Sequence, residues 1–364
     1  MGICGEYQLD TSCSLCFLLV KGEAKISTIK IADVAKAAGV STATVSRALS
    51  KPESVSQRRR ELVLRTVEAL GYAPNYAAKS LRTTRSQRII MTVPDISNPF
   101  FSAIIRAAEQ TAQAAGYAIL IGDTCHDSDR EEYYARMLAR READGLIFLG
   151  HWLAPSAAGI VTRLGMAAPI VNGCEYEPDL NVSSVHIDNA AAAAEAMRHL
   201  YELGHRRIGI VTGSVLSPIS RDRLEGVRGA AAGRGLGDEL PTRVGDFSID
   251  SGEALTHELL DEACPPTAIF CFSDEMAIGA IGALRERGLD CPGDVSVVGF
   301  DDIRVARAYH PGLTTIRQPK ELIGRKTVEI LLSILAGNGD GGTSITLPHE
   351  LVVRGSTAPP ATAR

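Results

Sequence analysis

A helical hydrophobic pattern opens the recognisable part of the chain, near its amino terminus. Over residues 30–38, apolar residues recur at i, i+3, i+4 and i+7, which predicts one amphipathic helix. These apolar residues are Ile31, Val34, Ala35 and Ala38. Gly39 follows, and glycine adopts a left-handed backbone without steric penalty. The pattern therefore predicts a short helix followed at once by a tight turn.

A second short helix is predicted directly after this turn. Ser41 stands at its expected N-cap, and Val45, Ala48 and Leu49 recur on the side expected to be buried. Two helices joined by a tight glycine turn form a helix-turn-helix, whose second helix fits the major groove of DNA. An ordinary helical hairpin on a protein surface gives the same pattern, and Arg47 would then be a solvated charge.

A third helix and a short connecting segment complete the predicted head. The helix is expected over residues 57–70, between an N-cap at Ser56 and a stop at Gly71. Its buried positions are expected to be Leu62, Val63, Val67 and Leu70. Residues 75–82 have a helix-forming composition but too few residues to be stable alone. We expect this segment to become ordered on DNA with Leu81 in the minor groove; a plain linker, with Leu81 packed on the body, is the alternative.

From Arg88 onward, short and wholly apolar runs alternate with alanine-rich helical stretches, as in parallel sheets covered on both faces. The predicted strands are residues 88–93, 118–121, 145–149, 169–171, 184–187, 208–211, 268–272, 295–299, 314–316 and 345–347. The helices between them include residues 101–115, 190–203, 223–234, 275–287 and 321–335. These strands are too many for one sheet of ordinary width, so we expect an α/β body of two doubly wound lobes with a cleft between them.

Charge separates the two parts of the chain. Residues Ser27–Arg88 hold twelve Lys and Arg but only four Asp and Glu, whereas the 364-residue chain has a net charge of −5. A basic module on an acidic body is typical of a phosphate-binding head. The predicted domains are a disordered extension over residues 1–26, a head over 27–74, a hinge and linker over 75–87, and a two-lobed body over 88–364.

Several classes of function lack their sequence signals. No apolar run approaches the roughly 18 residues of a membrane span, and the apolar residues 15–20 are too few for a secretory signal, so a reducing cytoplasm is expected. Cys13 and Cys16 form a lone C-x-x-C, and no second pair of cysteines has zinc-ligand spacing, so no metal site is expected. No cofactor is expected either. Without a G-x-S-x-G elbow, P-loop or H-E-x-x-H motif, no enzyme is expected. A periplasmic solute receptor would share the body but not the basic head.

Polar and aromatic residues gather at the expected carboxyl ends of the strands, where ligands bind in such folds. They are Asp95, Asn98, Phe100, Phe101, Asp123, Asp188, Arg221, Arg223, Phe247, Ser273, Asp274, Asp301, Asp302 and Gln318. Carboxylates, an Arg and an amide can hold vicinal hydroxyls, and aromatic rings stack on a sugar or a base. For any single Asp, capping of a helix is an equal alternative, most clearly for Asp188. Together these residues predict a site for a small polar ligand.

The run IKIADVAKAAGVSTATVSRAL, residues 29–49, resembles the head of LacI/GalR-family transcription regulators. Further family-like marks are GY at 71–72, LGHRRIG at 203–209, DEMA at 274–277, VVGFDD at 297–302, and LTTI at 313–316 with Gln318. Within the family, VSTATVSRAL, VHIDN at 185–189 and RGST at 354–357 are most similar to cytidine-responsive members.

The resemblance implies a homodimer that binds a near-palindromic operator and responds to a small effector. The family's DNA-contacting positions fall on Thr42, Ala43, Thr44, Ser46 and Arg47 in the head and on Asn75, Ala78 and Leu81 in the hinge. The body is similar to ribose-binding periplasmic proteins. Their contact positions fall on Asn98, Phe100, Phe101, Arg223, Phe247, Ser273, Asp301 and Gln318.

A nucleoside such as cytidine is therefore the expected effector, with a sugar or a purine as alternatives. The chain departs from the pattern at Cys174 and Glu175, where many sugar-binding relatives carry Asp-Arg, and at Ser273, which replaces a common Asn. We expect the contacts to the ligand hydroxyls to differ accordingly. The sequence leaves open whether the effector induces or co-represses, and whether a partner activator shares the promoter.

Overall fold

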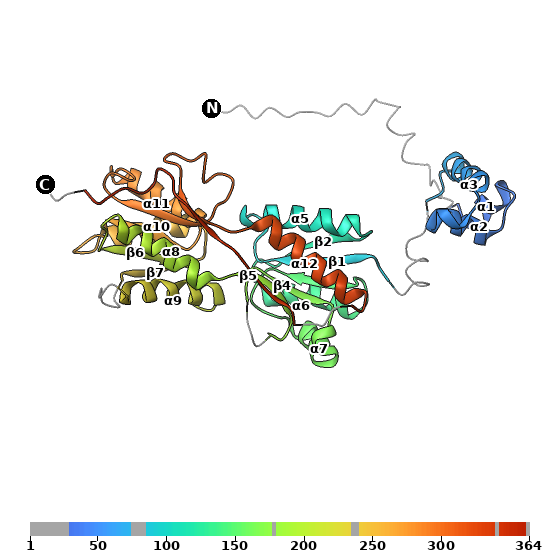
Figure 1. Cartoon of the computed structure of the whole chain (residues 1–364), viewed down its shortest axis with the longest axis horizontal. Coiled ribbons are helices and arrows are strands. Elements are labelled where there is room, and N and C mark those ends of the chain that lie inside the picture. Colours follow the sequence, from blue (N-terminus) through green and yellow to red (C-terminus); the bar gives the residue numbers. More distant parts are fainter. Residues whose placement is uncertain (1–28, 74–84, 177–179, 234–239, 339–341, 362–364) are drawn as a thin grey trace, which may run out of the picture. The chain divides into compact units, whose positions relative to one another are not determined.

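The computed structural model describes residues 29–73, 85–176, 180–233, 240–338 and 342–361 (Figure 1). The chain divides into two compact units, Met1–Arg82 and Thr83–Arg364. The predicted extension over residues 1–26 and the predicted hinge positions Asn75, Ala78 and Leu81 lie outside the described residues. Within the described ranges, no helix is long and apolar enough to cross a membrane.

The first unit contains three helices and a short 3-10 turn around a small core. They are α1 (Ile31–Ala37), α2 (Thr42–Ser50), η1 (Pro52–Ser54) and α3 (Gln57–Leu70). Val34, Val45 and Val63, one from each α-helix, are fully buried. Gly39 has a φ of 61° between α1 and α2, and Gly71 has the same φ after α3, so both glycines end a helix as predicted.

The structure confirms the position of one predicted feature of α3 and corrects another. Ser56 occupies the N-cap position, but its side chain makes no capping hydrogen bond. Leu62 is 46% exposed, while Val67 and Leu70 are only half-buried. Neighbouring residues point about 100° apart around a helix, and α3 packs on α1 and α2 with the side that carries Val63. Leu62 therefore points away from the core.

The second unit contains two six-stranded sheets. The first sheet is wholly parallel and has the order β11-β5-β4-β3-β1-β2. Its strands are β1 (Arg88–Val93), β2 (Ala118–Asp123), β3 (Gly145–Phe148), β4 (Ile170–Gly173), β5 (Ser183–Ile187) and β11 (Ser344–Leu347). Helices α5 (Phe100–Ala114) and α12 (Lys320–Leu335) cover one face. Helices α6 (Ser128–Ala139) and α7 (Pro155–Leu164) cover the other, and this half of the unit is the N-lobe.

The second sheet has the order β12-β10-β9-β8-β6-β7, and only β12 runs antiparallel to its neighbour. Its strands are β6 (Ile208–Thr212), β7 (Thr242–Val244), β8 (Ala268–Cys271), β9 (Ser296–Asp301), β10 (Thr314–Arg317) and β12 (Glu350–Val352). Helix α8 (Asn189–Glu202) packs on α9 (Pro218–Ala232), and α10 (Ile249–Leu260) packs on α11 (Asp274–Glu286). This half is the C-lobe.

The described chain passes between the lobes three times. It crosses after β5, after β10, and between β11 and β12. The first two crossings carry Asp188 and Gln318, which the sequence placed at strand ends. Asp188 caps α8, since its carboxylate accepts from the N–H of Ala191 at 2.8 Å. The connections that join the lobes thus begin beside the ends of buried strands.

Glycine allows α9 to pack closely on α8 and α12 to pack closely on α5. A Cβ on Gly226 of α9 would lie 2.0 Å from the carbonyl oxygen of Ala190 in α8. A Cβ on Gly324 of α12 would lie 2.2 Å from the carbonyl oxygen of Ile104 in α5. Any side chain there would force the helices apart. These contacts fix where α9 and α12 lie, and α9 carries Arg223.

Candidate DNA interface and ligand site

Helix α2 presents a small polar face. The Ser41 hydroxyl accepts from the N–H of Thr44 at 3.1 Å and lies 2.9 Å from the Thr44 hydroxyl, so this cap orients the first turn. Val45 and Ala48 are buried against the other two helices, which fixes the rotation of α2. Thr42, Ala43 and Arg47 are consequently exposed, while Thr44 and Ser46 are half-buried. The five residues predicted to contact DNA therefore lie on or beside one exposed face.

Positive charge lies exposed in the same unit. Arg47 is exposed, and its Nε donates to the carbonyl of Ala43 at 3.3 Å. Arg58 and Arg59 are exposed in the first turn of α3, which contains no acidic residue. Cations near the N-terminus of a helix are unfavourable to the helix dipole, and a bound phosphate would relieve that repulsion.

Arg223 forms the buried centre of the predicted ligand site in the C-lobe. Its side chain extends from α9, and the residue is only 2% exposed. Nε donates to Asn189 Oδ1 at 2.9 Å, Nη1 donates to the carbonyl of Phe272 at 2.5 Å, and the guanidinium lies 3.6 Å from the centre of the Phe300 ring. Burial lowers its pKa to about 10, against the opposing effect of nearby carboxylates. Nη2 has no hydrogen-bond partner in the described protein.

Asp301 faces this guanidinium from the end of β9. Its Oδ1 accepts from Gln318 Nε2 at 2.7 Å, and its backbone carbonyl accepts from Lys320 Nζ. Burial raises the pKa of Asp301 to about 6, while the charges of Arg223 and Lys320 oppose the shift. Within the described chain its second oxygen, Oδ2, accepts no hydrogen bond. One carboxylate oxygen and one guanidinium nitrogen are thus left over for a ligand.

Phe247 and Ser273 make mainly structural contacts. Phe247 has a φ of 71°, and its ring lies against Gly213, where a Cβ would be 2.0 Å from the ring. The Ser273 hydroxyl accepts from the N–H of Met276 at 3.1 Å, which caps α11, and donates to the carbonyl of Phe247 at 3.2 Å. At Ser273 the structure therefore shows helix capping, the role that was the alternative for the Asp residues at strand ends.

The predicted N-lobe residues form a separate group. Asn98 Oδ1 accepts from the N–H of Phe100 at 2.9 Å, and the rings of Phe100 and Phe101 meet edge to face at 5.1 Å. No hydrogen bond or ion pair between described residues joins this group to Arg223. The two lobes do influence each other there. The pKa of Glu275 in α11 is raised to about 7 by burial and by the charges of Asp95, three residues before Asn98, and Asp301.

The structure adds residues that the sequence analysis did not single out. His151, in the loop after β3, pairs with Glu175, in the loop after β4. Ser217, directly before α9, donates to the same Glu175 carboxylate. Glu131 of α6 and Lys320 of α12 also lie beside these strand ends. His151 follows β3 as the other candidates follow their strands, so the rule for strand ends covers it, but no local signal marks Glu131, Ser217 or Lys320.

One group of side chains has the composition of a metal site. Ligand atoms of Glu253, His257 and Glu286 lie within 4.8 Å of one another. Both ring nitrogens of His257 are already engaged, Nδ1 by Arg287 Nε at 3.0 Å and Nε2 by Glu286 at 3.2 Å. The group therefore forms a surface network of ion pairs between α10 and α11.

Known proteins share both parts of this arrangement. Residues 30–75 match the family described as bacterial regulatory proteins, lacI family, and residues 197–357 match the periplasmic binding protein-like domain. The chain is 40% identical over 339 residues to the HTH-type transcriptional repressor CytR of Escherichia coli, which covers 93% of this chain and 99% of that repressor.

Solved structures agree with the sequence relatives. The lac repressor dimer bound to operator and the anti-inducer ONPF has a TM-score of 0.81 and 29% identity, covering 91% of this chain and 99% of that one. A LacI-family regulator from Enterococcus faecium with bound ribose has a TM-score of 0.67 and 30% identity, covering 75% of this chain and 99% of that one. The lac repressor shares both the helix-turn-helix head and the two-lobed body of parallel sheets. The chain belongs to the LacI family of DNA-binding transcriptional regulators.

Proposed function

We propose that the protein is a cytoplasmic repressor that binds a near-palindromic operator as a homodimer and is controlled by a nucleoside. The head, residues 27–74, would read the operator. The hinge, residues 75–87, would connect it to a body, residues 88–364, that binds the nucleoside and forms the dimer. This extends the family assignment to a partner, an oligomeric state and a ligand class.

The exposed face of α2 supports the DNA-binding part of the proposal. In this assignment Thr42, Ala43 and Arg47 reach base edges in the major groove, because they are exposed on one side of a helix whose other side is buried. Thr44 and Ser46 lie at the margin of this face. The exposed Arg58 and Arg59 would neutralise phosphates, which adds affinity without specifying sequence. The operator-bound lac repressor dimer supports a two-fold arrangement.

One observation carries the ligand assignment. Arg223 in α9 and Asp301 at the end of β9 are buried in the body, and each has one hydrogen-bonding atom without a partner in the described chain. A donor beside an acceptor suits a pair of vicinal hydroxyls such as O2′ and O3′ of a ribose. Gln318 and Lys320 hold Asp301 in position. In this proposal Asn98, Phe100, Phe101, Phe247 and Ser273 form the walls of the site.

Free ribose is the second candidate ligand. The regulator from Enterococcus faecium contains bound ribose at 30% identity, so a site of this kind can accept the sugar alone. Nucleoside and ribose differ in whether a base occupies part of the site. The resemblance of VSTATVSRAL, VHIDN and RGST to cytidine-responsive members of the family favours the nucleoside.

The test is a thermal-shift screen of the purified protein against cytidine, uridine, adenosine, free bases and ribose, because a ligand that binds the folded state raises Tm. We expect a nucleoside to give the largest shift and then to change the affinity of the protein for DNA selected from random sequence. A shift with ribose alone would replace the nucleoside with the sugar. Equal affinity for all DNA sequences would contradict the operator assignment.

A further inference from the structure

Three side chains that the ribose assignment does not use form a row at the ends of β3 and β4. His151 Nδ1 lies 3.3 Å from Glu175 Oε2, and the same oxygen accepts from the Ser217 hydroxyl at 3.0 Å. His151 and Glu175 belong to the N-lobe, whereas Ser217 directly precedes α9 of the C-lobe. Glu131 of α6 is the fourth member of the row: the pKa of His151 is raised first by its hydrogen bond to Glu175 and then by the charges of Glu175 and Glu131. Glu175 is thus held from both lobes.

The row lies near enough to Arg223 and Asp301 for their charges to interact. Glu175 acts on the pKa of Arg223, and both Arg223 and Asp301 act on the thiol of Cys174, the residue before Glu175. Ser217 is the N-cap residue of α9, and Arg223 lies six residues further along the same helix, which is about 9 Å along the helix axis. A nucleoside has a comparable length, so its ribose can reach Arg223 while its base reaches Glu175.

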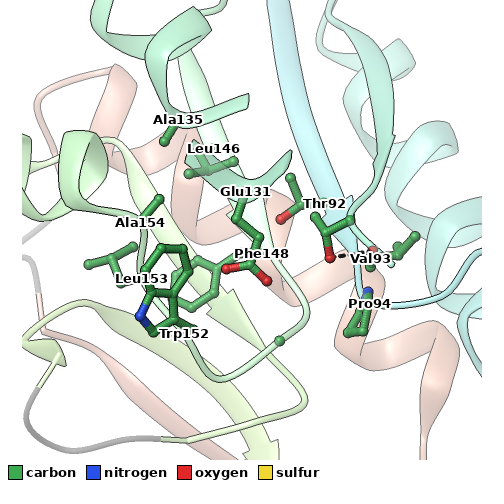
Figure 2. A pocket seen from close by; sticks show the side chains of 12 residues that line it. Thr92, Val93, Pro94, Glu131, Ala135, Leu146, Phe148, Trp152, Leu153 and Ala154 are labelled. Atoms are coloured by element: carbon green, nitrogen blue, oxygen red, sulfur yellow. Dashed lines mark hydrogen bonds between the residues drawn. The ribbon is translucent and has the colours of Figure 1, made fainter. Parts of the chain in front are cut away.

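Hydrogen-bonding capacity in the row is left unused. Both contacts of the buried Glu175 go to Oε2, so Oε1 has no partner in the described chain. In Glu131 the oxygen Oε2 is buried and has no partner. Figure 2 shows the Glu131 carboxylate between the rings of Phe148 and Trp152 on one side and Thr92 and Pro94 on the other. The adjoining cavity of about 20 Å³ has room for one water-sized group.

Buried acceptors without partners are unfavourable unless a ligand or water supplies a donor. Oε2 of Glu175 is engaged by His151 and Ser217, so the carboxylate oxygen Oε1 is left to accept a hydrogen bond. A base with an exocyclic amino group provides such a donor, as in cytosine or adenine. Uracil and hypoxanthine present a carbonyl oxygen at the same position, which would face Glu175 acceptor to acceptor. Trp152 is 39% exposed beside the row and offers a ring face to the base.

We propose that Glu175, positioned by His151 and Ser217 and assisted by Glu131, selects an amino-bearing nucleobase over its carbonyl analogue. The inference rests on the proposed function, because it assigns the base of the nucleoside whose ribose Arg223 and Asp301 would hold. It makes Glu175, at the position where the chain departs from the Asp-Arg of sugar-binding relatives, the residue that determines specificity.

The test is calorimetric titration of the full-length protein with cytidine and uridine, and with adenosine and inosine as a second pair. We expect the wild type to bind the amino-bearing member about 10- to 100-fold more tightly, the range for a hydrogen bond to a charged group. Glu175→Gln keeps the shape of the side chain and an oxygen for Ser217, but it can turn a donor toward the base. The preference should then fall to about threefold or less, or reverse.

The control variant is Glu142→Gln, in the same lobe, because Glu142 is exposed near the opposite, amino-terminal end of β3. It should keep the wild-type preference, and the Tm of each variant verifies folding. His151→Gln should reduce the preference less than Glu175→Gln, since it removes only a positioning contact.

Two outcomes would overturn the inference in different ways. If Glu175→Gln changes the affinities for both members of a pair by the same factor, Glu175 only links the lobes and does not read the base. If the wild type binds ribose but no nucleoside, the proposed nucleoside control fails, and this inference fails with it.

Discussion

Arg223 and Glu131 are both ionisable side chains that folding removes largely from water, but their surroundings differ. Arg223 donates to Asn189 and Phe272 and faces the charge of Asp301. Glu131 has a buried oxygen without a partner, and its pKa is raised to about 7, first by burial, against the opposing charge of His151. The protein therefore retains the charge on Arg223, while folding favours the protonated form of Glu131.

Glu131 should make the stability of the body depend on pH. Its pKa rises from 4.5 to about 7 on folding, so the folded state binds the proton more tightly. Its stabilising contribution is complete below its unfolded pKa and is lost as the pH rises through about 7. Glu131→Gln mimics the protonated form at every pH. Its Tm relative to the wild type should therefore increase between about pH 5 and about pH 8.

The effects of other buried carboxyl groups cancel in this comparison, whereas His151 follows Glu131, because the charge of Glu131 helps to raise the pKa of His151. The pKa values of Glu275 and Asp301 are also raised, but both residues are present in the wild type and the variant, so their effects cancel in the difference. Glu142→Gln, at an exposed position, should show no such trend. A difference in Tm between Glu131→Gln and the wild type that stays constant across this pH range would show that folding does not perturb Glu131.

At the scale of elements, strongly patterned segments could be predicted from the sequence and weakly patterned ones could not. Strand β1 begins and ends at the predicted residues, because it is apolar and buried along almost its whole length. The edge strands β7 and β12 were missed, since they are short and partly exposed. Helix α9 starts at Pro218, five residues before the predicted position, because its first turn contains polar residues.

The same distinction applies to the candidate site. Arg223, Asp301 and Gln318 could be proposed from the rule that ligands gather at strand ends, and the structure brings them together. The contact between Glu175 and Ser217 could not be proposed, because it joins two loops that meet only after both lobes have folded. The rule gives candidates on each strand, but tertiary packing decides which of them face each other.

The N-cap of α2 gives a prediction at this scale. Ser41→Ala removes the acceptor for the N–H of Thr44 and should destabilise the head by about 1 kcal/mol. Thr42→Ala is the matched control, because Thr42 is exposed in the next position and makes no side-chain hydrogen bond in the described chain. Hydrogen exchange of α2 amides in the full-length protein should be faster in Ser41→Ala only. Equal exchange in both variants would show that the cap does not stabilise α2.

At the scale of the whole molecule, three chain crossings and the contact between Glu175 and Ser217 connect the two lobes. A ligand that contacts Arg223 and Asp301 in one lobe and Glu175 in the other would favour one lobe arrangement over others. If that arrangement also changes operator affinity, the ligand and the operator are coupled. The coupling must be reciprocal, and is typically worth about 1–3 kcal/mol, or about 5- to 150-fold in affinity.

Asp301→Asn separates ligand binding from this coupling. Asn tolerates positive φ better than Ala does, which suits the φ of 112° at this position, and it keeps an oxygen for Gln318 while removing the charge opposite Arg223. We expect nucleoside affinity to fall about 10- to 100-fold, because a hydrogen bond to a charged acceptor is lost. Operator affinity without ligand should be unchanged.

When operator binding is titrated with ligand, the midpoint should move to a ligand concentration that is higher by the same factor. Operator affinity at saturating ligand should still equal that of the wild type. A reduced limit at saturation would mean that Asp301 takes part in coupling the lobes to the operator, and unchanged nucleoside affinity would remove Asp301 from the ligand site altogether.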